Sequence, residues 1–144
     1  MAVRTARAVW EGSLREGNGR LSFGQGEHAY DGPYSFASRF EEGDGTNPEE
    51  LIGAAHAGCF SMALAGDLVK AGHSPTSIRT EAEVHLEKVD GASTITRIRL
   101  TTVGQVDGLD QAAFEEQARG ARANCPVSRA LTGVVIEVEA RLEG

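Results

Sequence analysis

The stretch LIGAAHAGCFSMALAGDLV, residues 51–69, decides how this chain folds. It is an apolar run rich in alanine and glycine, with Cys59 near its middle. Its length approaches that of a membrane span, yet it carries His56, Ser61 and Asp67. Such a helix is better explained as one buried inside a protein, at a subunit interface, than as one in lipid.

Clear signals mark both ends of this helix. Asn47 can cap it, Pro48 suits the first helical position, and Glu50 stands where a capping box needs a carboxylate. Gly72 is a suitable stop at the other end. The pattern predicts a helix over residues 48–71, roughly 36 Å long, which is long for so small a protein.

Composition bounds the class of protein. A chain of 144 residues is about one domain long, and its net charge of -7 argues against a nucleic-acid partner. Two cysteines are too few for a secreted disulfide framework, and no signal peptide is visible, so we expect a cytoplasmic protein without a membrane span. We predict a single domain over residues 1–144, built from N-terminal strands over 1–46, the long helix over 47–71 and a hairpin, helices and last strand over 77–144.

The remaining segments predict an α+β fold, an antiparallel sheet with helices packed on it. The expected strands are Val3–Trp10, Arg20–Phe23, Tyr34–Phe40 and Val134–Leu142, with helices at Leu109–Ala123 and Pro126–Leu131. Between the long helix and residue 109 the sequence predicts a hairpin. A two-residue turn there would place Val84 opposite Arg97 and mix the faces, so we predict a three-residue loop, 89–91, that pairs Ala82 with Ile98 and Glu83 with Arg97.

The two cysteines occupy different settings. Cys59 lies in the apolar helix, where a thiol is most often an inert small side chain. Cys125 precedes Pro126 at a helix start, where unpaired N–H groups favour the thiolate. An arginine against a thiol also lowers its pKa, and a carboxylate behind that arginine would hold it in place. Arg39 with Glu49 or Glu50 is a candidate for that combination.

Two motifs resemble a known family. GTNPEELIGAAHAGCFSMAL, residues 45–64, and CPVSRAL, residues 125–131, resemble the two cysteine motifs of the OsmC family, which also contains the organic hydroperoxide resistance proteins. The SRFE segment, residues 38–41, resembles the OsmC branch. The resemblance implies an intertwined homodimer, with antiparallel sheets around long central helices and two active sites at the interface. It also implies a peroxidase that reduces organic hydroperoxides in stress defence.

By position in those motifs, Cys59 matches the peroxidatic cysteine and Cys125 the resolving one. Arg39 matches the arginine that activates the thiolate, and Glu49 the family's glutamate. The implied cycle forms a Cys59 sulfenic acid and then a Cys59–Cys125 disulfide, which a dithiol reduces; relatives suggest a lipoyl group or another dithiol. No cofactor and no metal are implied. Gly58 departs from the family, where alanine is more usual.

Helix geometry adds a prediction about the assembly. Glu49 and Cys59 are ten residues apart on one helix, roughly 15 Å along its axis, so they cannot touch within a chain. A glutamate that orients the arginine at Cys59 then most simply comes from the partner chain of an obligate dimer. Two other functions stay open: a redox-sensing module that oxidises once without turnover, and a structural dimer with inert thiols. His56, one turn before Cys59, is expected to be a packed histidine rather than a base or a zinc ligand.

Overall fold

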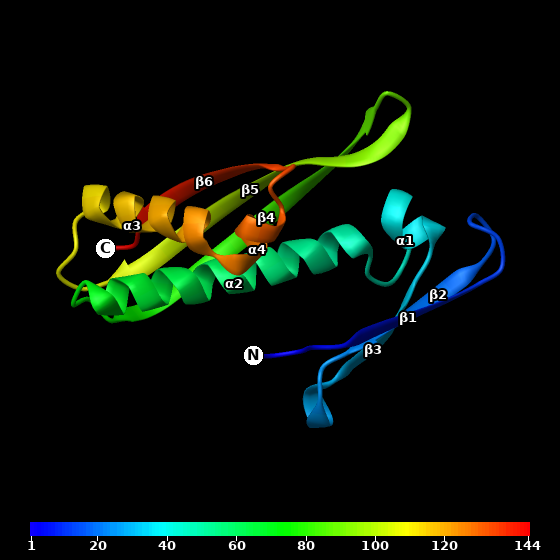
Figure 1. Cartoon of the computed structure of the whole chain (residues 1–144), viewed down its shortest axis with the longest axis horizontal. Helices are drawn as coiled ribbons and strands as arrows, with labels where there is room; N and C mark the ends of the chain where they lie inside the picture. Colours follow the sequence, from blue (N-terminus) through cyan, green and yellow to red (C-terminus); the bar gives the residue numbers. More distant parts are fainter. The chain divides into compact units, whose positions relative to one another are not determined.

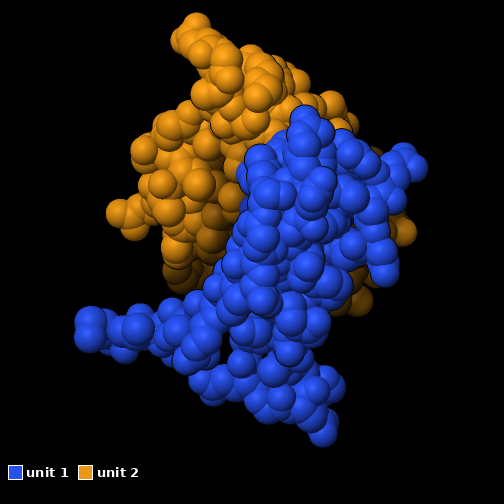
Figure 2. All heavy atoms as spheres, turned by 90° about the vertical axis from the view of Figure 1, so that its right-hand side faces the viewer, with its two compact units in different colours: residues 1–51 blue, residues 52–144 orange.

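The computed structural model describes residues 1–144, which divide into two compact units, residues 1–51 and 52–144 (Figure 2). The first unit holds a three-stranded antiparallel sheet of β1 (Ala6–Glu11), β2 (Asn18–Phe23) and β3 (Tyr30–Tyr34), with a short 3-10 turn, Gly26–His28, before β3. The two strands predicted first are confirmed with shifted ends. The single domain over residues 1–144 stays a prediction.

The strand predicted at Tyr34–Phe40 is wrong. The segment forms helix α1 (Phe36–Phe40) instead, directly after β3. Ser35 caps this helix: its hydroxyl accepts from the N–H of Ser38, and the hydroxyl of Ser38 accepts in return from the N–H of Ser35. This reciprocal cap satisfies two backbone donors, which outweighs the strand preference of the aromatic residues around it.

The long helix is confirmed as α2 (Pro48–Lys70), which begins in the first unit and continues into the second. Asn47 Oδ1 accepts from the N–H of Glu50 at 2.8 Å, as an N-cap does. The Glu50 carboxylate does not close the predicted capping box and accepts from the Thr46 hydroxyl instead. Gly72 follows the last turn with a φ of 93°, a conformation that glycine adopts readily.

The second unit contains β4 (Pro75–Val89), β5 (Ala92–Val106), α3 (Gln111–Asn124), α4 (Pro126–Ala130) and β6 (Val135–Leu142) (Figure 1). The α+β class is confirmed, but this sheet is not wholly antiparallel. Its order is β4-β5-β6, and β6 runs parallel to β5. The reason is the connection: α3 and α4 carry the chain from the end of β5 back to the beginning of β6, and such a crossover joins parallel strands.

The predicted hairpin register is also wrong. The turn has two residues, Asp90 and Gly91, both with positive φ. A β-bulge keeps the apolar side chains on one face of the hairpin and the charged side chains on the other. The register shifts beyond His85, which leaves Thr96 as the extra residue of β5. Val84 therefore lies opposite Ile98, and one face stays apolar. On the same register, Ala82 pairs with Leu100, Glu83 with Arg99 and His85 with Arg97.

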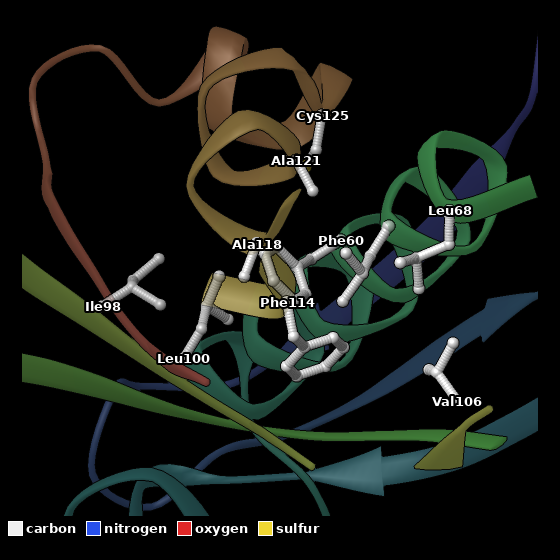
Figure 3. Close-up of a cluster of buried hydrophobic side chains, with 10 residues drawn as sticks. Phe60, Leu68, Ile98, Leu100, Val106, Phe114, Ala118, Ala121 and Cys125 are labelled. Carbon is white, nitrogen blue, oxygen red and sulfur yellow. The ribbon is translucent and has the colours of Figure 1, made fainter. Parts of the chain in front are cut away.

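The buried core lies in the second unit. Its fully buried members come from three elements and from the cap residue before α4: Phe60, Leu64 and Leu68 of α2, Ile98 and Leu100 of β5, Phe114, Ala118 and Ala121 of α3, and Cys125 (Figure 3). The alternate residues Val134, Ile136, Val138 and Ala140, at the start of β6 and along it, pack against this cluster. The core therefore fixes α2 and the start of α4 on one sheet, which brings the segments of the two cysteines together.

Candidate functional site

The two cysteines belong to the same unit, on α2 and at the start of α4. Cys59 is half-buried and Cys125 fully buried, and both are free thiols. Cys125 ends α3 and caps α4, with Pro126 at the first helical position as predicted. The two thiols act on each other's ionisation: Cys125 adds to the burial that raises the pKa of Cys59, and Cys59 contributes to lowering the pKa of Cys125. The structure thus brings together two residues that stand 66 positions apart in the sequence.

The Cys125 sulfur has the better environment for negative charge. Burial opposes ionisation, but hydrogen bonds outweigh it and lower the pKa of Cys125. The largest come from Ser128, whose hydroxyl and N–H lie 3.5 and 3.4 Å from Sγ, and Cys59 and the Val127 N–H add smaller contributions. Donors aimed at a sulfur stabilise its thiolate.

Cys59 has the opposite tendency. Burial raises the pKa of its thiol, the Val127 N–H offsets part of this, and the neighbouring Cys125 raises it further. A thiolate at Cys59 consequently needs a cation in addition to these groups.

Arg39 and Glu49 form a bidentate ion pair in the first unit. The guanidinium Nε lies 3.1 Å from both carboxylate oxygens, and a terminal nitrogen lies 2.6 Å from Oε1. The pair joins the last turn of α1 to the first turn of α2, and the Glu49 side chain is only 11% exposed. Of the two acids that the sequence left open, the structure selects Glu49, because Glu50 accepts from Thr46. Such a fork fixes the plane of the guanidinium.

The site also contains a contact that the sequence did not predict. His56 is fully buried, as expected for a packed histidine, but its Nε2 lies 2.7 Å from the Ser128 hydroxyl. Burial lowers the pKa of His56, so the imidazole is neutral near pH 7. Ser128 stands three residues after Cys125, the spacing of a capping interaction, so the sequence held a signal for the contact of Ser128 with Cys125 but none for its contact with His56.

Two further properties limit the chemistry. No group of three or more His, Cys, Asp or Glu side chains could hold a metal ion.

Helix α2 is long and apolar enough to cross a membrane by length and composition alone, and 28% of its most apolar window is buried within the chain. Phe60, Leu64 and Leu68 nevertheless pack it into a core with the sheet, as in a soluble protein.

Comparison with known proteins assigns the family. The family model described as OsmC-like protein matches residues 41–139, which include both cysteines. The chain belongs to the OsmC-like family. It is 48% identical over 128 residues to Peroxiredoxin OsmC of Escherichia coli, covering 89% of each chain.

Solved OsmC-like structures share the fold. An OsmC-like protein of Vibrio cholerae superposes with a TM-score of 0.76 at 16% identity, over 97% of this chain and 99% of its own. The organic hydroperoxide resistance protein OhrB of Bacillus subtilis superposes with a TM-score of 0.67 at 27% identity, over 99% and 100%. The resemblance inferred from the two cysteine motifs is therefore confirmed, and so is the OsmC-like fold.

Proposed function

We propose that this OsmC-like protein is a thiol-dependent peroxidase that reduces organic hydroperoxides to alcohols. The observation that carries the proposal is the pair of free thiols on α2 and before α4, close enough to act on each other's ionisation. The relatives support the same activity, since one is named a peroxiredoxin and another an organic hydroperoxide resistance protein. A redox sensor would also use two thiols, but it would not turn over.

The chemistry follows from the two thiols. The Cys59 thiolate attacks the outer oxygen of the hydroperoxide, the O–O bond breaks, and the alkoxide leaves as an alcohol after taking a proton. Cys59 becomes a sulfenic acid, with which Cys125 condenses to form a disulfide and water. A dithiol, of which a lipoyl group is one example, then restores both thiols by exchange. Cys59 is assigned the first role because it is the more exposed sulfur, while Cys125 is fully buried.

The arginine at Cys59 comes, in this proposal, from a second copy of the chain. Glu49 and Cys59 lie ten residues apart on α2, roughly 15 Å along the helix axis, and Glu49 holds Arg39 in a bidentate pair. The Arg39–Glu49 pair of one subunit would therefore serve Cys59 of the partner subunit. Two such sites would make the homodimer obligatory for activity.

The exposed face of α2 supports this dimer. Ala54, Gly58, Met62 and Gly66 recur every four residues, so they share one face. All four are exposed in the single chain, Met62 by 79%, and a Cβ added at either glycine would meet no atom within 4 Å. Glycine in a helix interior costs about 0.5–1 kcal/mol relative to alanine, and close packing of a second long helix would offset that cost.

Turnover of two cysteine variants tests the function. With cumene hydroperoxide and a dithiol reductant, Cys59→Ser should show no turnover, whereas Cys125→Ser should consume about one equivalent of peroxide and then stall. Ser61→Ala is the control, because Ser61 lies on the same helix but bonds to Thr80. Equal residual turnover in the two cysteine variants would contradict the assigned roles, and a wild-type protein that never cycles would favour the sensor.

A further inference from the structure

The buried His56 lies at one end of a short hydrogen-bonded chain. Its Nε2 is 2.7 Å from the Ser128 hydroxyl, and that hydroxyl is 3.5 Å from the Cys125 sulfur. All three side chains are buried: His56 and Cys125 have no exposed surface, and Ser128 is 8% exposed. Bulk water therefore has little access to the Cys125 proton, and the Ser128 hydroxyl is the polar side-chain group that links it to a base.

The hydrogen-bonded series His56–Ser128–Cys125 has two alternative proton arrangements. A hydroxyl has one proton to donate. When Ser128 donates to His56, its oxygen is free to accept the Cys125 S–H; when His56 donates to Ser128, the hydroxyl donates to a Cys125 thiolate. Moving one proton along each bond converts the first arrangement into the second. The geometry fits both, because a hydroxyl rotates about its C–O bond while the heavy atoms stay in place.

The remaining ring nitrogen points to the same role. His56 Nδ1 is buried and has no hydrogen-bond partner within the chain. A histidine with the sole role of linking α2 to α4 would be more stable with a second hydrogen bond, which would fix its tautomer. This ring is bonded at Nε2 alone, so the one bond it makes leads to Cys125.

We propose that His56 and Ser128 form a proton relay that deprotonates Cys125 when it attacks the Cys59 sulfenic acid. The proposal rests on the peroxidase function above and concerns only its second step. The Cys125 electron pair forms the S–S bond while the S–O bond of Cys59 breaks; the Cys125 sulfur is oxidised and the Cys59 sulfur reduced. The Cys125 proton moves to the Ser128 oxygen as the Ser128 proton moves to His56 Nε2. The departing hydroxide at the half-buried Cys59 takes a proton from solvent to become water, and the imidazolium returns its proton through Ser128 when reduction of the disulfide regenerates the Cys125 thiolate.

Few charges compete with this relay. The shift in the pKa of His56 comes from burial, with no charged side chain contributing. Among titratable groups, the neighbouring Cys59 is the one that acts on the pKa of Cys125. On the adjoining helices, Arg129 of α4 is exposed and Arg122 of α3 donates to the Ile136 carbonyl of β6. The imidazole therefore stays neutral near pH 7 and can accept a proton.

Separate rates for the two steps test the relay. Reduced protein is mixed with one equivalent of cumene hydroperoxide, quenched at intervals, and analysed by mass for dimedone-trapped sulfenic acid and for disulfide. The variants are His56→Gln, which keeps a hydrogen bond to Ser128 but has no titratable nitrogen, and Ser128→Ala. Ser61→Ala is the control on α2. At pH 7 both relay variants should form sulfenic acid at the wild-type rate and disulfide at least tenfold more slowly, since general base catalysis contributes about 10²–10⁴-fold.

The pH profile separates a relay from a structural tie. At about pH 9.5 the Cys125 thiol of His56→Gln still accepts the hydrogen bonds from Ser128 and ionises without a relay, so the disulfide rates of this variant and of wild type should agree within about twofold. The relay would be overturned if the variants formed disulfide more slowly than wild type by the same factor at every pH. It would also be overturned if both variants formed disulfide at the wild-type rate at pH 7. Either result would leave the peroxidase function intact. Absence of both sulfenic acid and disulfide in the wild type would overturn the proposed function, and the relay with it.

Discussion

The Arg39–Glu49 pair allows stability and reactivity to be separated by experiment. The Glu49 residue is 8% exposed, while the Arg39 side chain is 35% exposed, so the pair is only partly screened by water. Loss of one partner of a fully buried pair costs about 3–5 kcal/mol, because the other charge is left unpaired. Partial exposure of the arginine lowers that figure, and we expect Arg39→Met to cost about 1–3 kcal/mol. Adding Glu49→Gln removes the unpaired charge and should recover most of the loss.

Reactivity should behave differently from stability. An ordinary thiol with a pKa of about 8.5 is about 3% ionised at pH 7, and a thiol beside a cation is about half ionised or more. Loss of the arginine should therefore slow sulfenic acid formation at Cys59 by about 15-fold or more. The double variant should be as slow as Arg39→Met, since the glutamine restores stability but supplies no cation.

Urea denaturation at fixed protein concentration and rapid-quench sulfenic acid trapping measure the two effects. Arg20→Met is the control, because the Arg20–Asp31 pair in the same unit is more than half exposed and should contribute less than about 1 kcal/mol. If the double variant regained wild-type reactivity together with its stability, Arg39 would be a structural residue only. If Arg39→Met reacted at the wild-type rate, activation of Cys59 by this arginine would be refuted.

Three further predictions follow from burial and packing. Because burial lowers the pKa of His56, the unfolded chain binds more protons than the folded chain as pH falls through 6.5. Stability should therefore decrease as pH falls below about 6.5, and His56→Gln should remove that part of the pH dependence in urea titrations. Gly58→Leu should break the proposed dimer in sedimentation experiments, whereas Gly120→Leu, also at an open helical glycine, should leave it intact. Gly104→Ala should cost about 1–3 kcal/mol, because its Cβ would lie 2.5 Å from the buried Phe114 ring, and a denaturation midpoint equal to wild type would contradict this packing.

Local signals in the sequence were sufficient for the long helix α2. Asn47, Pro48 and Gly72 mark the ends of α2 by capping chemistry that acts within a few residues, and the structure has all three in those roles. The same logic, applied to the reciprocal serine cap of α1, would have corrected the strand predicted at residues 34–40.

Non-local features could not be predicted in the same way. The hairpin register depends on a bulge at Thr96, and no residue of the turn predicts that bulge. The parallel pairing of β6 depends on where α3 and α4 return the chain. The polar pairings likewise depend on distance in space. Glu49 and Glu50 were equivalent as partners of Arg39 until the turn before α2 was known, and the contact of His56 with Ser128 joins residues 72 positions apart.

The central claim is that the two thiols act in one peroxidase cycle. The most direct test exposes reduced protein to one equivalent of cumene hydroperoxide and counts free thiols over seconds by mass spectrometry. The account predicts loss of both thiols with formation of a Cys59–Cys125 disulfide, much faster than with hydrogen peroxide. Two thiols that persist would contradict it and would identify a folded protein whose cysteines are structural.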